Sequence, residues 1–145
     1  SPAMAYPASK VAAEKALQES DLKWSILRFG FVYGDKDGHL ETLPALAQRI
    51  KLHPAAKYSM IHHRDIATLI RLGLDGKFDQ TIINAADDSP MSVYEVSQLV
   101  GDPLKPSDAP LENPWSGQLD TTLARSLGFQ PSVATIWQAV RENLL

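Results

Sequence analysis

The residue pair best suited to chemistry is Tyr6 and Lys10, in the segment Tyr-Pro-Ala-Ser-Lys near the start of the sequence. A phenol titrates near pH ~10 and is a poor acid or base at neutrality, whereas a nearby ammonium group favours the phenolate and lowers that pKa. Residues four apart on a helix share one face, so the spacing indicates a proton-transfer pair. The same spacing also arises by chance, so the pair needs support from other segments.

A helix over residues 7–19 is predicted to carry this pair. Pro7 suits the first turn of a helix, and the alanine-rich sequence after it favours helix formation. Residues 22–29 are short and mostly apolar, which predicts a buried strand directly after the helix. Three glycines then follow at intervals of four, and they predict a loop: Gly30, Gly34 and Gly38.

Helical and extended patterns alternate along the rest of the chain. Asp65 is predicted to cap one helix, Ser92 and Glu95 have the spacing of a capping box, and Ser132 is predicted to cap the last helix. Residues 102–118 contain four prolines and predict a long loop. Strands separated by helices indicate an α/β fold with parallel pairing. Helices are expected from about Pro44 to 53, at 65–76, 92–101, 121–127 and from 132, and extended segments at 58–61 and 80–85.

Composition limits the classes of function. The chain has 145 residues, 44% apolar, enough for one domain with a real core. A net charge of −3 without a Lys/Arg cluster argues against nucleic acid or an anionic membrane surface as the partner. No apolar run is long enough to span a membrane, and there is no cysteine for a disulfide or a thiolate metal site. These features are typical of a cytoplasmic protein.

Two other groups of polar residues favour structural roles. His62 and His63 are adjacent, so their side chains should diverge, and the remaining histidines, His39 and His53, lie in separate segments. We therefore predict no metal site. The neighbouring acids Asp87 and Asp88 precede Ser-Pro and are predicted to be solvated in a turn.

The order of several segments resembles the extended short-chain dehydrogenase/reductase family, the NAD-dependent epimerase/dehydratase group. The resemblance is to the C-terminal half of that family and spans essentially the whole chain. Each segment is a weak signal alone, but five in the right order make chance an improbable explanation. The segments are Tyr-Pro-Ala-Ser-Lys at 6–10, Leu-Arg-Phe-Gly-Phe-Val-Tyr-Gly at 27–34, Ile-His-His-Arg-Asp-Ile-Ala at 61–67, Ile-Asn-Ala-Ala at 83–86 leading to Ser-Val at 92–93, and Leu-Gly-Phe-Gln-Pro at 127–131.

The resemblance implies a role for each matching residue. Tyr6 would be the general acid/base, while Lys10 would lower its pKa and hold the nicotinamide ribose. The side chain of Phe31 would face a small-molecule substrate, and His62 would lie near the substrate side. The backbone implied to lie along the nicotinamide of NAD or NADP is that of Phe29, Gly30, Phe31 and Val32. The implied fold is the C-terminal part of a Rossmann-like doubly wound parallel sheet with a small substrate-binding subdomain.

The sequence also departs from the family pattern. Phe29 and Phe31 stand where the family usually has proline and asparagine, and the segment between Gly34 and Asp65 is short. We therefore expect a compact, more apolar pocket, which argues against a nucleotide-sugar substrate. No glycine-rich phosphate loop between a strand and a helix is present in residues 1–145.

These departures lead to an expectation about the whole enzyme. Residues 1–145 are expected to be the C-terminal catalytic and substrate-side portion, with the N-terminal dinucleotide-binding portion absent, so that this chain alone binds neither NAD nor NADP and is inactive. In this family the helix equivalent to residues 7–19 helps to form a homodimer. The alternative is a non-catalytic binding or assembly module that keeps the family fold.

Overall fold

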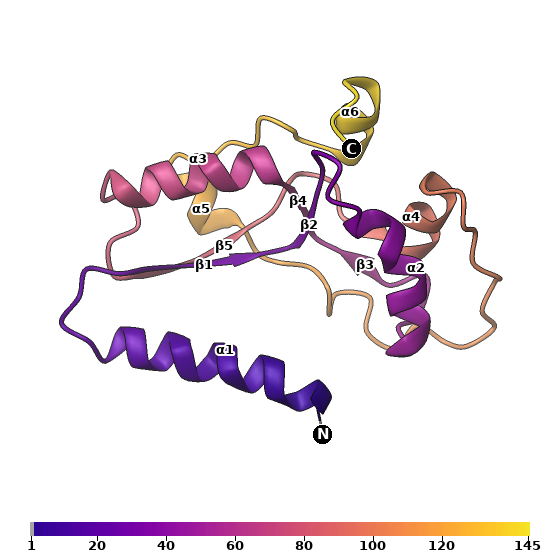
Figure 1. Cartoon of the computed structure of the whole chain (residues 1–145), viewed down its shortest axis with the longest axis horizontal. Helices are drawn as coiled ribbons and strands as arrows, with labels where there is room; N and C mark the ends of the chain where they lie inside the picture. Colours follow the sequence, from indigo (N-terminus) through magenta and orange to yellow (C-terminus); the bar gives the residue numbers. More distant parts are fainter. Residues whose placement is uncertain (1) are drawn as a thin grey trace.

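The computed structural model describes residues 2–145, with side chains from Tyr6 onward, and it has an α/β fold (Figure 1). Helices and strands alternate for most of this length, as the sequence predicts. The helices are α1 (Pro2–Gln18), α2 (His39–Arg49), α3 (His63–Leu74), α4 (Val93–Leu99), α5 (Thr122–Ser126) and α6 (Ile136–Arg141). The strands are β1 (Ser25–Phe29), β2 (Phe31–Tyr33), β3 (Lys57–Tyr58), β4 (Met60–His62), β5 (Thr81–Ala85) and β6 (Met91–Ser92).

The longest strands, β1 and β5, form a parallel pair at the centre of the molecule. Ser25 lies opposite Thr81 at one end of this pair and Phe29 lies opposite Ala85 at the other. Parallel strands need a crossover connection, and the helix α3 lies in the segment that joins them. Within residues 2–145 each of the two strands has one hydrogen-bonded neighbour strand.

At Gly30 the chain leaves the β1–β5 pair and enters the β2–β4 pair. The amide of Gly30 donates to O of Ala85, the last residue of β5, and the next amide, of Phe31, donates to O of Ser59, directly before β4. A Cβ at Gly30 would lie 2.3 Å from Ser59 O, so the two backbones can approach this closely only at a glycine. The loop predicted from Gly30 is therefore wrong at its start, because β2 pairs in parallel with β4.

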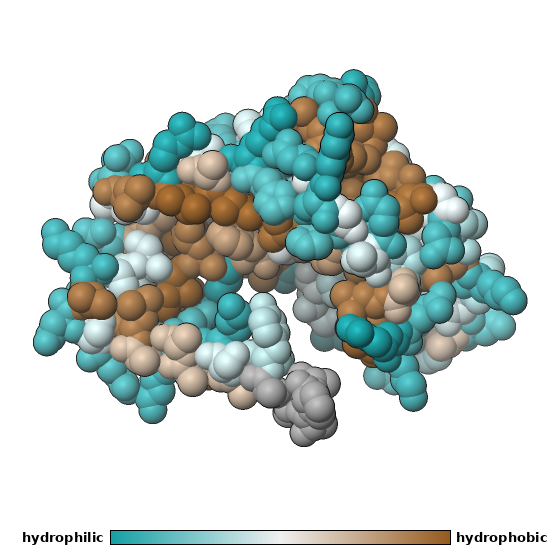
Figure 2. All heavy atoms as spheres, in the orientation of Figure 1, coloured by the Kyte–Doolittle hydropathy of each residue, from teal (hydrophilic) through white to brown (hydrophobic). Residues whose placement is uncertain are grey.

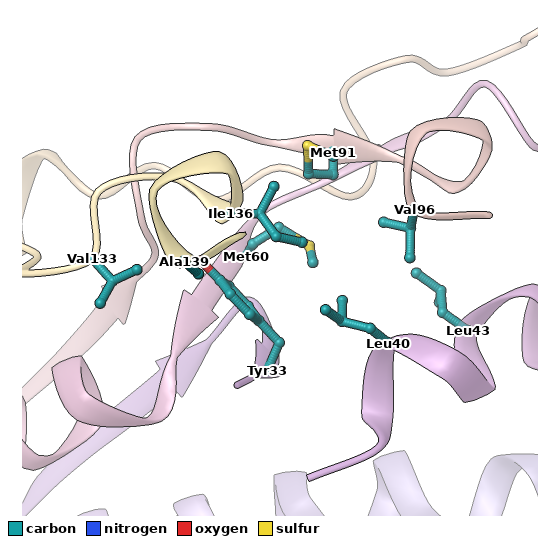
Figure 3. Packing of buried hydrophobic residues seen from close by; sticks show 9 residues of the cluster. All are labelled: Tyr33, Leu40, Leu43, Met60, Met91, Val96, Val133, Ile136 and Ala139. Atoms are coloured by element: carbon teal, nitrogen blue, oxygen red, sulfur yellow. The ribbon is translucent and has the colours of Figure 1, made fainter. Parts of the chain in front are cut away.

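Two groups of buried side chains hold the layers together. One lies under α2, α4 and α6; Figure 3 shows Ile136 and Ala139 beside Met60 and Tyr33, and Val96 facing Leu43. The other lies between the β1–β5 pair, α3 and α5, and includes Phe78, Ile83 and Phe129, all fully buried. Burying such side chains supplies most of the favourable free energy of folding.

Helix α1 lies apart from both cores. It runs alongside the β1–β5 pair, in the direction opposite to β1 (Figure 1). Its side chains from residue 6 onward are mostly exposed, with Val11 67% exposed, while Glu14 and Leu17 are half-buried. The guanidinium of Arg28 on β1 donates to the carboxylate of Glu14, with Nε 3.0 Å from Oε1. This ion pair is the main polar link between α1 and the sheet.

Several predicted helix boundaries are corrected by the structure. Helix α1 begins before Pro7, which lies inside it, and α2 likewise begins at His39, so that Pro44 lies in its interior. Thr135, and not Ser132, caps α6. The capping box of Ser92 and Glu95 is confirmed at the start of α4.

The cap of α3 also differs from the prediction. The residue before the helix, His62, accepts the amide of Arg64 and is the N-cap. Asp65 instead reaches residues far along the chain. Its carboxylate accepts the amide and the hydroxyl of Ser132, at 2.6 and 2.7 Å, and the amide of Val133 at 3.1 Å. The fully buried Asp65 thus holds the segment before α6 against the start of α3.

None of the described helices has the length and hydropathy to cross a membrane.

Candidate functional site

Tyr6 and Lys10 lie on one exposed face of α1, as their spacing predicts. The Lys10 ammonium lies over the Tyr6 ring, with Nζ 5.3 Å from the ring centroid. At this distance the cation interacts with the electron-rich face of the ring. The Tyr6 side chain is 69% exposed, so its hydroxyl is accessible to a ligand. The structure therefore brings the two predicted catalytic groups together on the surface.

The direction of α1 decides which end of the sheet the pair approaches. Glu14 is held by Arg28, and α1 and β1 run in opposite directions (Figure 1). Tyr6 precedes Glu14 by about 12 Å along the helix at 1.5 Å per residue. Phe31 follows Arg28 by roughly 10 Å along an extended chain. Going back along α1 from Glu14 and forward along the chain from Arg28 leads in the same direction. Tyr6 therefore lies on the side of the carboxyl ends of the strands, where open α/β sheets bind ligands.

The segment of Phe29, Gly30, Phe31 and Val32 forms this end of the sheet. The amides of Gly30 and Phe31 are engaged by the neighbouring strands. Val32 O lies 3.3 Å from Nδ1 of His39, and the Phe31 ring packs edge-to-face on the His39 ring with centroids 6.4 Å apart. The half-buried ring of Phe31 is therefore the part of this segment best able to meet an apolar ligand group.

His62 lies in the interior of the protein. It is fully buried, its Nδ1 accepts the amide of Arg64, and its Nε2 lies 2.9 Å from Leu144 O. Because Nδ1 accepts, the proton is on Nε2, which donates to Leu144 O. A Cβ at Gly34 would lie 2.1 Å from Nε2, so a glycine is needed beside the ring. His62 offers no surface to a ligand, and we leave it out of the proposed substrate contacts.

A buried carboxyl group near this end of the sheet was missed by the sequence analysis. Asp87 follows β5 and is only 6% exposed, so the predicted solvated turn is wrong for this residue. It accepts the hydroxyl of Tyr33 at 3.2 Å and the amide of Ser89 at 3.0 Å. Burial raises the pKa of Asp87 to about 7, and burial beside Asp87 also raises the pKa of Tyr33. Asp88, in contrast, is exposed and pairs with Arg125.

Two surface hollows are lined by residues that are distant in sequence from Tyr6 and Lys10. The larger, about 660 Å³, lies between the end of α2 and the proline-rich loop and is lined partly by His53, Tyr58 and Pro110. The smaller, about 360 Å³, lies between β1 and α3 and is lined partly by Trp24 and Ile70. Ligand pockets have volumes of about 300–1,000 Å³, so the larger hollow is big enough for a small molecule.

Comparison with known proteins identifies a similar fold. No protein-family model matches the sequence, and no curated protein matches it either. Among solved structures, the chain is similar to the UDP-glucose 4-epimerase of the hyperthermophilic bacterium Thermotoga maritima, determined with UDP-glucose. The TM-score is 0.61 at 18% sequence identity, over 92% of this chain and 48% of the epimerase chain. The chain therefore has the α/β fold of a Rossmann-like epimerase over about half the length of that enzyme.

Proposed function

We propose that residues 1–145 are the catalytic and substrate-side portion of an NAD(P)-dependent epimerase/dehydratase-type oxidoreductase. Tyr6 is the general acid/base and Lys10 is its cationic partner. The observation that carries the proposal is that both side chains share an exposed face of α1, at the end of the helix that lies on the side of the carboxyl ends of β1 and β5. The likeness to the fold of an epimerase supports it, and open α/β sheets bind their ligands at this edge.

In this proposal the chain's own residues position and protonate the substrate. Tyr6 exchanges a proton with a substrate hydroxyl or carbonyl, and the Lys10 ammonium stabilises the phenolate that forms. Phe31 gives the reacting group an apolar wall. The dinucleotide, when bound, accepts and returns the hydride.

The residues present fit only the nicotinamide end of such a cofactor. Of the glycines after β1, Gly30 is used for the close approach of two strands and Gly34 makes room for His62. A pyrophosphate would need a glycine-rich turn opening a helix, and neither glycine supplies one. Gly38 is the N-cap of α2, but it is a single glycine, and the acidic residues Asp35 and Asp37 in the same turn disfavour a phosphate group. The pyrophosphate is therefore assigned to a second, dinucleotide-binding portion of the enzyme, and Lys10 and residues 29–32 to the nicotinamide and its ribose.

Exposed apolar surface supports a partner of this kind. Two-stranded parallel sheets are rare on their own, because parallel sheets are normally covered on both faces. Figure 2 shows a brown, apolar band over α3 and the β1–β5 pair, and exposed side chains here include Leu74, 83% exposed, and Ile70, 49% exposed. We assign this band to contact with the dinucleotide-binding portion. A homodimer contact is assigned to the exposed surface of α1 that lies away from Tyr6 and Lys10 and includes Val11.

The catalytic role is tested by Tyr6→Phe in the protein that joins this chain to its dinucleotide-binding portion. Turnover should fall by about 10²–10⁴-fold, with nicotinamide binding retained, since the ring stays and only the proton-transferring hydroxyl is lost. Nicotinamide absorbance reports hydride transfer with a panel of hydroxy and oxo compounds that includes UDP-glucose. Tyr94→Phe is the matched control, because the Tyr94 hydroxyl bonds to the loop at Lys105 and Ser107.

The second candidate function is a non-catalytic binding or assembly module with the same fold. It is favoured by the exposure of α1, which offers an open face for association. In that case Tyr6→Phe would leave the protein's function unchanged. A separate calorimetric titration of residues 1–145 with NADH and NADPH should give no binding, and micromolar binding would show that the chain carries its own dinucleotide site.

A further inference from the structure

We propose that Asp37, His39 and His63 form a binding site for a divalent first-row transition-metal ion, for which Zn²⁺ is the probe. The three residues come from different segments: the turn after β2, the first residue of α2 and the first residue of α3. The site is separate from Tyr6 and Lys10 and does not depend on the function proposed above.

The donor atoms converge on one point. Oδ2 of Asp37 lies 2.9 Å from Nδ1 of His39 and 2.7 Å from Nε2 of His63. All three donor atoms lie within 4.8 Å of one another. Ligands at 2.0–2.2 Å from a tetrahedral zinc ion are about 3.3 Å apart, so shifts of a few tenths of an ångström to about 1 Å would admit the ion. The ion would replace the hydrogen bond between His63 and Oδ2 and the contact of His39 Nδ1 with Oδ2, and it would draw Nδ1 away from Val32 O.

The fold holds these atoms in place before any ion arrives. Oδ1 of Asp37 accepts the amide of His39 at 2.9 Å, which fixes the carboxylate at the start of α2 and leaves Oδ2 for the two imidazoles. Leu40, the next residue, is buried in the core and anchors the same turn. The donor atom Oδ2 is thus held beside both imidazoles by contacts within the fold.

The surrounding charges are close to balanced. Arg64 forms an ion pair with Asp35 beside the site, and Lys36 and Glu41 line a small hollow, of about 190 Å³, that Asp37 also lines. The partial positive charges at the N-termini of α2 and α3 disfavour a bound cation. The favourable free energy of coordination by two imidazoles and a carboxylate must outweigh this repulsion.

The donor set indicates the kind of ion. Two imidazoles and one carboxylate suit Zn²⁺ and its transition-metal neighbours, whereas Mg²⁺ and Ca²⁺ prefer oxygen ligands alone. Three protein ligands leave a coordination position open, as in zinc sites where water or substrate is the fourth ligand. The His39 and His63 side chains are 57% and 39% exposed, so solvent reaches this position.

Nitrogen-15 NMR of the histidine rings tests the site directly in the 145-residue chain, which has four histidines. One equivalent of Zn²⁺ should shift Nδ1 of His39 and Nε2 of His63 and leave His53 and His62 unchanged. Shifts confined to His53, or no shift with excess Zn²⁺, would overturn the proposal. This readout needs no variant and therefore does not depend on how a variant folds.

Calorimetry with variants gives the second test. His39→Ala and His63→Ala should each weaken Zn²⁺ binding by at least about tenfold, the scale of loss when even an outer-shell partner is removed. His53→Ala is the matched control and should bind as the parent does, because His53 bonds to Ala109 O away from the site. Mg²⁺ and Ca²⁺ should give no binding. Equal Zn²⁺ affinity in the parent and both site variants would contradict the assignment.

Discussion

The guanidinium of Arg28 on β1 donates to the carboxylate of Glu14 on α1, and this ion pair joins the helix that carries Tyr6 and Lys10 to the central strands. It lowers the pKa of Glu14 through the hydrogen bond from Arg28. Among the α1 side chains from Tyr6 onward, the other half-buried one is Leu17. The position of the candidate catalytic pair relative to the sheet therefore depends strongly on one exposed interaction.

Breaking this ion pair should loosen α1 without unfolding the core. In Arg28→Gln, amide hydrogen exchange in α1 should accelerate by about 2–5-fold, as expected for loss of an exposed ion pair, while exchange in β5 and α3 stays the same. Lys15→Gln is the control, since the ion pair of Lys15 with Glu19 joins α1 to the residue just after it and does not involve the sheet. Unchanged exchange in α1 would show that other contacts hold the helix.

The buried carboxyl group of Asp87 should make stability fall as pH rises. Burial raises its pKa from 3.8 to about 7 in the folded protein. Between these values the unfolded chain releases this proton and the folded chain keeps it, so the folded state is progressively disfavoured as pH rises toward 7. Asp87→Asn should have nearly the parent's stability at about pH 4 and exceed it at about pH 8, by about 1–4 kcal/mol.

Urea unfolding at the two pH values measures this difference. Tyr33→Phe should change the pH dependence of stability in the direction opposite to Asp87→Asn, because the Tyr33 hydroxyl stabilises the ionised form of Asp87. Its removal should make the loss of stability at high pH larger than in the parent. A parent protein equally stable at both pH values, with Asp87→Asn showing the same profile, would mean that Asp87 ionises normally.

Two glycine substitutions should act in opposite directions. In Gly30→Ala the new methyl group would lie 2.3 Å from Ser59 O, a backbone atom that cannot move independently, so the protein should lose about 3 kcal/mol or more. In Gly73→Ala the nearest atom is 3.7 Å away, and the residue lies inside α3. Alanine there should stabilise the protein by about 0.5–1 kcal/mol. Thermal unfolding of the two variants is the measurement, and similar midpoints would contradict the close approach at Gly30.

Sequence predicts well those features that depend on neighbours along the chain. The capping box of Ser92 and Glu95 and the buried strands around Ile26 and Ile83 were predicted because capping and hydrophobic patterning are local. Gly30 was misread for a physical reason. A glycine can mark a turn or a place where two backbones meet, and the second meaning depends on Ser59, which is distant in sequence.

The candidate site shows the same division. The spacing of Tyr6 and Lys10 predicts that they share a helix face, and they do. No local pattern could predict the burial of Asp87 beside Tyr33, or the convergence of His39 and His63 on Asp37. Those relationships arise from strand pairing and helix packing between separate segments, so they became visible only in the folded structure.

The contacts of Asp65 and His62 also have a consequence for how the chain is made. Both residues are fully buried, and their polar atoms bond to Ser132, Val133 and Leu144, which lie 67, 68 and 82 residues later in the sequence. On the ribosome these partners emerge well after α3, so the start of α3 would carry buried polar groups without partners until residues 132–144 have been made. We expect nascent chains that stop before residue 132 to remain sensitive to protease in α3, and the segment 132–145 to complete the folding of α3.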